Sequence, residues 1–180
     1  MNVSTLCLAF LSFGEASGYD IRKASTEGNF SHFVDASYGA IYPALDRLEG
    51  DDLVTRRVEV QDGKPSRHVY ALTDKGREAL VSQLMEPVSP DKMKSEFLLL
   101  TLCAEHLPQE RLEQALDQRI AEIDALTEDL SSKSSDCNHA PSQWVIRFAT
   151  LMNRTKRDYL KANRDALIAL GKPAQSAAAE

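Results

Sequence analysis

Residues that could contact a phosphate group begin a predicted helix over residues 37–50. Hydroxyls are carried by Ser37, Tyr38 and Tyr42, and the small residues Gly39 and Ala40 leave the backbone amides between them accessible. The N-terminus of a helix presents unpaired amides and the positive end of the helix dipole, so it attracts anions. Ser37 is the expected N-cap. The pattern therefore indicates a helix end that can approach a polyanionic partner such as the DNA backbone.

The same helix combines a core-facing stripe with an unusual outward face. Its apolar residues recur at i, i+3, i+4 and i+7 and are Ile41, Ala44, Leu45 and Leu48. Pro43, on the outward face, presses its ring on the carbonyl of Gly39, which has no side chain to obstruct adjustment. We expect a mildly distorted helix that can approach a partner backbone closely.

A basic hairpin is predicted after this helix. Two β-prone runs, residues 53–61 and 67–72, flank an Asp-Gly dipeptide, and the five residues between them favour a protruding loop over a two-residue turn. Lys64 and Arg67 near the tip can reach phosphates or a minor groove. The alternative is that these charges are the solvated edge of an ordinary hairpin.

The order of elements predicts a winged helix-turn-helix. Helices are expected from Val3, over residues 19–27 and over 37–50, followed by the hairpin and by a fourth helix with Thr73 as its N-cap. Ser17 and Asp20 form a capping-box-like start for the second helix. The fold class is mostly α with a small β-hairpin: a winged helix-turn-helix over residues 1–86, a helical dimerisation domain over 87–170 and a disordered tail over 171–180.

The second half of the chain, which follows Pro87 and Pro90, contains no convincing strand. Apolar stripes lie on a helix predicted over residues 108–131 and on a last helix from Trp144 to Tyr159. Little else in the chain is left to cover these stripes. Pairing across a two-fold axis is therefore favoured over packing within one chain. The expected dimer contacts are Leu6, Phe10, Leu116, Ile120, Ile123, Phe148, Leu151, Met152 and Tyr159. A third interpretation is an effector pocket at the dimer seam, lined by Trp144 and Phe148.

Several short motifs carry a resemblance to a known family over residues 3–86. They are Gly18-Tyr19-Asp20-Ile21, Gly39-Ala40-Ile41-Tyr42-Pro43-Ala44-Leu45, Arg47-Leu48-Glu49, Leu53-Val54, Gly63-Lys64-Pro65-Ser66-Arg67, Tyr70-Ala71-Leu72-Thr73 and Gly76. In these residues the chain resembles the PadR family of bacterial transcriptional regulators. The resemblance implies a homodimeric winged-helix regulator, usually a repressor, that binds an inverted-repeat operator in double-stranded DNA.

The resemblance also implies roles for individual residues. Residues 37–42 would lie at the major groove, Tyr19 near the phosphate backbone, and Lys64 with Arg67 in the wing. One departure is Asp52, which stands where the family usually has glycine before Leu53. Aspartate can adopt the left-handed conformation at moderate cost, so the turn into the strand is open to change.

Base recognition is harder to derive, because the outward face of the predicted helix is poor in the residues that pair with base edges. Backbone contacts and DNA shape are therefore expected to supply much of the affinity and some of the preference. Two other hypotheses are a ligand-responsive sensor and a winged-helix adaptor that binds a protein instead of DNA.

Composition limits the remaining classes of function. The net charge of −6 argues against a protein that coats nucleic acid by bulk charge. Three widely spaced cysteines and the absence of a charged leader favour a cytoplasmic protein without disulfides, in which Cys7 and Cys103 are core thiols. The histidines have no metal-binding spacing, and no cofactor motif or catalytic pair is recognised. We expect neither a metal, a cofactor nor an enzymatic activity.

Overall fold

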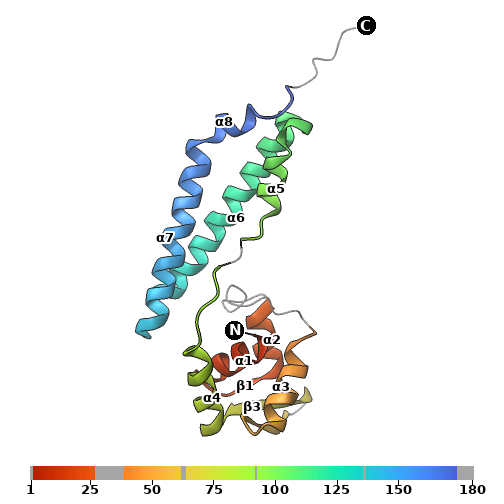
Figure 1. Cartoon of the computed structure of the whole chain (residues 1–180), viewed down its shortest axis with the longest axis vertical. Helices are drawn as coiled ribbons and strands as arrows, with labels where there is room; N and C mark the ends of the chain where they lie inside the picture. Colours follow the sequence, from red (N-terminus) through yellow and green to blue (C-terminus); the bar gives the residue numbers. More distant parts are fainter. Residues whose placement is uncertain (1, 27–38, 62–63, 92, 136, 174–180) are drawn as a thin grey trace. The chain divides into compact units, whose positions relative to one another are not determined.

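The computed structural model describes residues 2–26, 39–61, 64–91, 93–135 and 137–173. Contacts divide the chain into two compact units, Met1–Asp91 and Lys92–Glu180. The division falls at Asp91, slightly beyond the proline-rich break expected after residue 86. Each unit has its own helices, and the sheet belongs to the first (Figure 1).

The N-terminal unit has the element order of a winged helix-turn-helix, as predicted. It contains α1 (Val3–Leu11), β1 (Ala16–Ser17), α2 (Gly18–Thr26), α3 (Ile41–Gly50), β2 (Val54–Gln61), β3 (Lys64–Leu72) and α4 (Asp74–Leu84). The three strands are antiparallel in the order β1-β3-β2. The sequence predicted only the hairpin, because a two-residue strand such as β1 is too short to show a periodic pattern.

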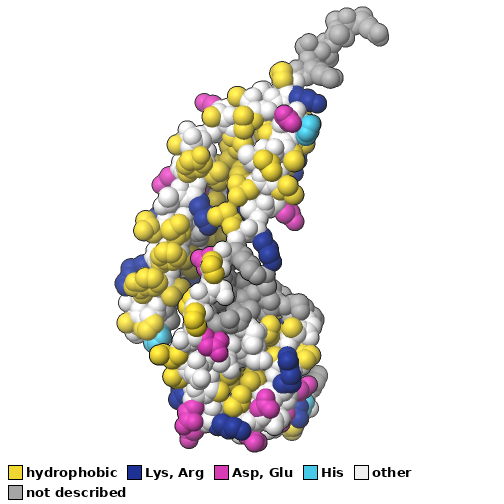
Figure 2. Space-filling view, viewed as in Figure 1, with side chains coloured by type: hydrophobic (Ala, Val, Ile, Leu, Met, Phe, Trp, Pro, Cys, Tyr) yellow, Lys and Arg dark blue, Asp and Glu magenta, His cyan; other side chains and the backbone are white. Residues whose placement is uncertain are grey.

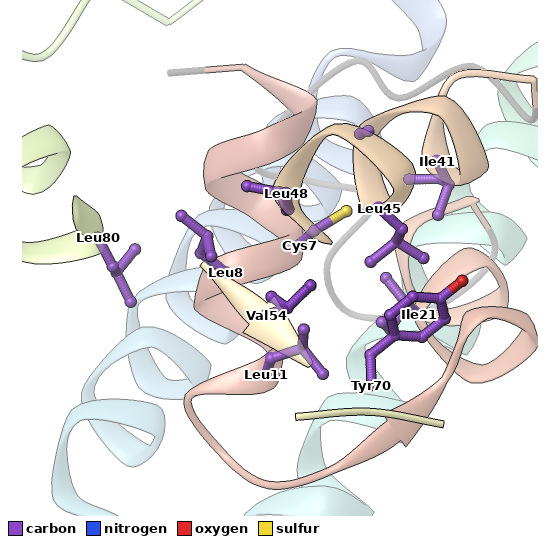
Figure 3. Packing of buried hydrophobic residues seen from close by; sticks show 11 residues of the cluster. Cys7, Leu8, Leu11, Ile21, Ile41, Leu45, Leu48, Val54, Tyr70 and Leu80 are labelled. Carbon is purple, nitrogen blue, oxygen red and sulfur yellow. The ribbon is translucent and has the colours of Figure 1, made fainter. Parts of the chain in front are cut away.

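The core of this unit is built mainly by α1 and α3. Cys7, Leu8 and Leu11 of α1 meet Leu45 and Leu48 of α3, and Val54, Tyr70 and Leu80 close the cluster from the sheet and α4 (Figure 3). The predicted stripe of α3 is buried in full. Burying each aliphatic side chain stabilises the fold by about 1.5–3 kcal/mol. This packing holds α3 by its inner face and leaves its other face exposed.

Two predicted caps are confirmed. The amide of Ser17 donates to the carboxylate of Asp20 at 3.2 Å, and the amide of Asp20 donates to the Ser17 hydroxyl at 3.2 Å. At the start of α4, the Thr73 hydroxyl accepts from the amide of Gly76 at 2.9 Å. Both caps satisfy amides that a helix leaves unpaired at its N-terminus.

The start of α3 differs from the prediction. The helix begins at Ile41, and its N-cap is Ala40, which makes no side-chain cap; Ser37, the expected N-cap, and Tyr38 lie outside the described residues. Pro43 is consequently in the first turn, where a missing amide costs no hydrogen bond. The expected distortion of the helix by Pro43 against Gly39 is therefore wrong, because Gly39 precedes the helix in a turn.

The hairpin is also tighter than predicted. Strand β3 begins at Lys64, which pairs with Gln61, so only residues 62–63 connect the two strands. The register shifts between Glu59 and Gln61. An extra residue in one strand adjusts the pairing and lets it continue closer to the tip. Lys64, Pro65 and Ser66, which were expected in the loop, belong to β3.

The turn from α3 into β2 is a Schellman motif centred on Asp52. This residue has φ 58°, in the left-handed region that glycine favours. The amide of Leu53 donates to the carbonyl of Leu48 at 2.9 Å, and the amide of Asp52 donates to that of Glu49 at 3.0 Å. These bonds satisfy carbonyls at the end of α3. Asp52 thus takes the left-handed conformation at the position where the PadR family usually has glycine.

The C-terminal unit is helical, as predicted, with α5 (Glu96–Leu102), the short 3₁₀ helix η2 (Ala104–His106), α6 (Gln109–Ser135), α7 (Ala140–Ala162) and α8 (Arg164–Ile168). Helix α6 packs against α5, α7 and α8. Helix α5 begins after Ser95, whose hydroxyl accepts from the amide of Leu98 at 3.2 Å. Among the described residues, no helix is both long enough and apolar enough to cross a membrane.

The C-terminal segment remains packed beyond the predicted start of the tail at residue 171. The amide of Lys172 donates to the carbonyl of Leu107 at 2.8 Å, and the amide of Gln109 donates to the carbonyl of Lys172 at 3.0 Å. Gly171 permits this approach, since a Cβ there would lie 2.7 Å from the Leu112 side chain. Residues 171–173 therefore pack against the N-terminus of α6. Residues 174–180 lie outside the described residues.

The two thiols expected in the core have different environments. Cys7 is fully buried, and burial raises its pKa to about 12. Cys103 is exposed, so its assignment to the core is wrong. The apolar run that contains it forms the short helix α5, which has no buried residue. A run of apolar residues does not by itself determine which of them are covered.

Candidate nucleic-acid interface

A pair of exposed tyrosines lies where the N-terminus of α2 meets α3. Tyr19 is 53% exposed and Tyr42 is 42% exposed. The ring of Tyr42 lies against the backbone of Gly18, where a Cβ would be 2.8 Å from the ring. Glycine at this position lets the first turns of two helices approach closely. Two aromatic hydroxyl-bearing side chains are thereby presented beside the amides that begin α2.

Arg22 adds a positive charge to this surface, and sequence reasoning missed it. Its guanidinium carbon lies 4.9 Å from the centre of the Tyr19 ring, in a cation–π arrangement. The two residues are three apart on α2 and so share a face of the helix. This i, i+3 spacing is the sequence signal from which the position of Arg22 beside Tyr19 could have been predicted. We name Tyr19, Arg22 and Tyr42 the tyrosine surface.

The outward face of α3 has the composition that the sequence predicts. Tyr42, Pro43 and Asp46 are exposed on this face, and Gly39 is exposed in the turn before the helix. Arg47, the one outward arginine of this helix, donates from Nε to the carbonyl of Pro43 at 3.1 Å. Its side chain therefore lies back along its own helix. This arrangement offers backbone, hydroxyl and shape contacts more readily than base-edge pairing.

The arginines of the hairpin are paired with acids, a feature that sequence reasoning did not anticipate. Arg56 reaches from β2 to α3, where its Nε lies 3.1 Å from Glu49 and its Nη1 lies 3.6 Å from Asp46. It also bonds the buried Tyr70 hydroxyl, and this hydrogen bond raises the pKa of Arg56. Burial raises the pKa of Tyr70. Arg56 is therefore held against α3, away from the tip of the hairpin.

Two further arginines share a second acidic group. Arg57 contacts Glu15 at 2.5 Å and Glu59 at 4.0 Å. Arg67, predicted to contact DNA, donates from Nε to Glu59 at 2.5 Å. Acidic and basic side chains lie close together at the lower end of the view in Figure 2. Lys64, the other predicted wing contact, begins β3, but its side chain lies outside the described part of the chain.

The residues expected at a dimer interface fall into two groups in the single chain. Leu6, Leu116 and Ile123 are buried, and Phe10 and Ile120 are half-buried. The members on α7 are exposed (Figure 2); they are Phe148, Leu151, Met152 and Tyr159. The buried group contributes to the packing of its own chain, whereas the α7 group forms an exposed apolar face.

The aromatic residues proposed for an effector pocket lie on the same face of α7. Trp144 and Phe148 stack with ring centroids 5.7 Å apart and an interplanar angle of 3°. Both are more than half exposed, so in the single chain they form an open surface rather than the wall of an enclosed cavity. In the described residues, no three histidine, cysteine or acidic side chains gather as a metal site would require.

The fold and this surface define the class of the protein: a winged helix-turn-helix with a separate helical unit. Within that class, residues 7–82 match the transcriptional regulator PadR-like family, so this part of the chain is similar to that family. A curated relative, the negative transcriptional regulator PadR of Bacillus subtilis, is 36% identical over 94 residues, covering 51% of this chain and 50% of the relative. The chain spans about half the length, or less, of the curated relatives it matches.

Solved structures match over both units. The PadR-like transcriptional regulator BC1756 from Bacillus cereus has a TM-score of 0.78 and 26% identity, covering 91% of this chain and 94% of that chain. Bacillus subtilis PadR in complex with operator DNA has a TM-score of 0.73 and 24% identity, covering 91% of this chain and 98% of that chain. The latter similarity shows the fold alone. The helical C-terminal unit, where sequence motifs are weak, thus has the fold expected from the resemblance.

Proposed function

We propose that this protein is a cytoplasmic transcriptional repressor that binds an inverted-repeat operator as a homodimer. The observation that carries the proposal is the tyrosine surface, which lies beside the exposed start of α3 on a winged-helix unit. The Bacillus subtilis relative is a negative transcriptional regulator. Occupation of the operator would block access to the promoter.

The proposal assigns contacts to three parts of the N-terminal unit. The residues from 37 to Tyr42, which lead into α3, enter the major groove, while Tyr19 and Arg22 contact the phosphate backbone. Lys64 and Arg67 of the wing contact phosphates or the adjacent minor groove. Because α3 offers little base-edge pairing, affinity comes largely from the backbone and depends on salt.

The exposed face of α7 supports a homodimer as the active form. Trp144, Phe148 and Leu151 are each more than half exposed, and Val145 and Met152 extend the same face. A contiguous apolar face of this kind is typical of a protein interface. A two-fold dimer would present two copies of α3 to half-sites about one helical turn apart.

The test is binding of the purified full chain to a duplex from its own upstream region at several salt concentrations. Each phosphate-contacting cation that is removed should lower the slope of log K against log salt by about one. Arg22→Gln is the test variant, and Arg77→Gln, on α4, is its control. Binding that is absent, or insensitive to salt, would refute the proposal and favour the protein-binding adaptor. An equal loss in both variants would show that Arg22 has no specific role.

A second candidate function is response to an aromatic effector, and the stacked Trp144–Phe148 pair favours it. Bacillus subtilis PadR has been solved with p-coumaric acid. A dimer that covers the α7 face would enclose this pair and create an apolar site. Titration with p-coumaric acid, followed by the fluorescence of the single tryptophan, should then show a saturable change and release of DNA. An unchanged signal would leave a regulator without this effector.

A further inference from the structure

Two arginines and one glutamate of the hairpin form an exposed cluster with Glu15, which directly precedes β1. We name Arg57, Arg67, Glu59 and Glu15 the wing charge cluster. Glu59 and Arg67 are directly opposed across β2 and β3, and Arg57 lies two residues from Glu59 on the same face of its strand. Glu59 therefore accepts from Arg67 through one carboxylate oxygen, 2.5 Å from Nε, while its other oxygen lies 4.0 Å from Arg57.

We propose that Glu59 lowers the affinity of the wing for DNA by competing with phosphate for Arg67 and Arg57. This inference rests on the proposed function, since it requires the wing to contact DNA. An arginine already bonded to a carboxylate must exchange that partner for a phosphate oxygen. Glu59 then remains beside the phosphate as an uncompensated negative charge. The residue thus sets the strength of the sequence-independent part of binding.

The exposure of the cluster makes the exchange feasible. The side chains of Arg67 and Glu59 are 46% and 36% exposed, and those of Arg57 and Glu15 are 51% and 54% exposed. Ion pairs in such surroundings contribute little to stability. DNA can therefore displace the glutamate without disrupting the hairpin. Removal of its charge should consequently change DNA binding more than folding.

The expected effect can be sized from Coulomb's law. A like charge at roughly 7 Å from a phosphate in water weakens binding about threefold, and screening reduces this as salt rises. Conversion of Glu59 to glutamine adds one net positive charge to the interface. The slope of log K against log salt should therefore become steeper by about one. The gain should be similar for specific and unrelated duplexes, because phosphates are common to both.

The experiment measures binding of the full chain to its upstream duplex and to an unrelated duplex across several salt concentrations. Glu59→Gln should bind both about threefold more tightly at low salt. Glu15→Gln, which releases Arg57 alone, should give a smaller gain. The matched control is Glu122→Gln, which removes the same charge from an Arg119–Glu122 pair of 3.1 Å on α6. The gain from Glu59→Gln should shrink in an Arg67→Gln background.

Each outcome decides between alternatives. Unchanged or weaker binding by Glu59→Gln, in a protein whose wild type binds DNA, overturns the inference and leaves the proposed function intact; weaker binding would mean that Glu59 positions Arg67 for its contact. An equal gain in Glu122→Gln also overturns it, because net charge alone would then suffice. If the wild type binds neither duplex, the proposed function fails, and the inference falls with it.

Discussion

Replacement of Asp52 by glycine should stabilise the N-terminal unit. Asp52 is the described non-glycine residue with a left-handed backbone, at φ 58°, and its position in the Schellman motif is one that glycine favours. A non-glycine residue in this region costs about 1–2 kcal/mol, with aspartate at the low end. Glycine forfeits about 0.5–1 kcal/mol through its freedom in the unfolded chain. The difference predicts a gain of up to about 0.5 kcal/mol for Asp52→Gly.

Other contacts of Asp52 change this magnitude little. Its carboxylate lies 3.9 Å from the Lys75 ammonium and is 87% exposed, so the pair contributes almost nothing. Asp51→Gly is the matched control. Asp51 has φ −89°, which any residue adopts, so glycine there has only the entropic cost and should lower stability by about 0.5–1 kcal/mol.

The assay should follow the N-terminal unit alone, and Cys7 provides the probe. Its thiol is fully buried and its pKa is raised to about 12, so it reacts only when the unit opens. In a background where Cys103 and Cys137 are serine, labelling of Cys7 across a urea series reports the unfolding midpoint. A lower midpoint for Asp52→Gly, or an equal rise for Asp51→Gly, would refute the reasoning.

Three further predictions concern other parts of the chain. Gly76→Ala should destabilise the N-terminal unit by about 2–3 kcal/mol or more in the same assay, because its Cβ would lie 1.9 Å from the carbonyl oxygen of Leu53; Gly50→Ala, which has open space around it, should not. Leu151→Asp should shift the protein from dimer to monomer in sedimentation experiments, since the residue is 62% exposed on the apolar face of α7, whereas Arg154→Asp should not. Hydrogen bonding to Arg164 lowers the pKa of Asp117, so this pair stabilises the C-terminal unit above the ordinary carboxyl pKa and loses its effect as pH falls through the lowered value. Arg164→Gln should flatten that acid-side decline in unfolding followed by tryptophan fluorescence, and an unchanged pH profile would contradict the assignment.

The sequence predicted those features of the fold that depend on neighbours along the chain. The buried stripe of α3, the capping box at Ser17, the N-cap at Thr73 and the helical character of the second half all follow from periodicity and cap chemistry. These signals are local, because a side chain three or four positions away occupies the same face or the same turn. The left-handed conformation of Asp52 could be predicted in the same way, because this residue directly follows a helix.

Features that depend on distant segments were not predictable from such patterns. The pairing of β1 with β3 joins residues far apart in the chain. The start of α3 at Ile41 placed Pro43 in the first turn, contrary to the expected distortion. Cys103 was assigned to the core, although it is exposed in the turn after α5. In each case the sequence specified the tendency of a segment, and the surrounding elements determined its limits or its burial.

The candidate interface divides in the same way. By itself the sequence determined its chemistry: tyrosines at a helix start, arginines in a hairpin and an apolar stripe on a late helix. The tertiary structure decided which of these groups are available, because it places Glu49 and Glu59 against the hairpin arginines and the Tyr42 ring against Gly18. Electrostatic and packing interactions act across space over a few ångströms. Which groups come within that distance is a property of the folded chain.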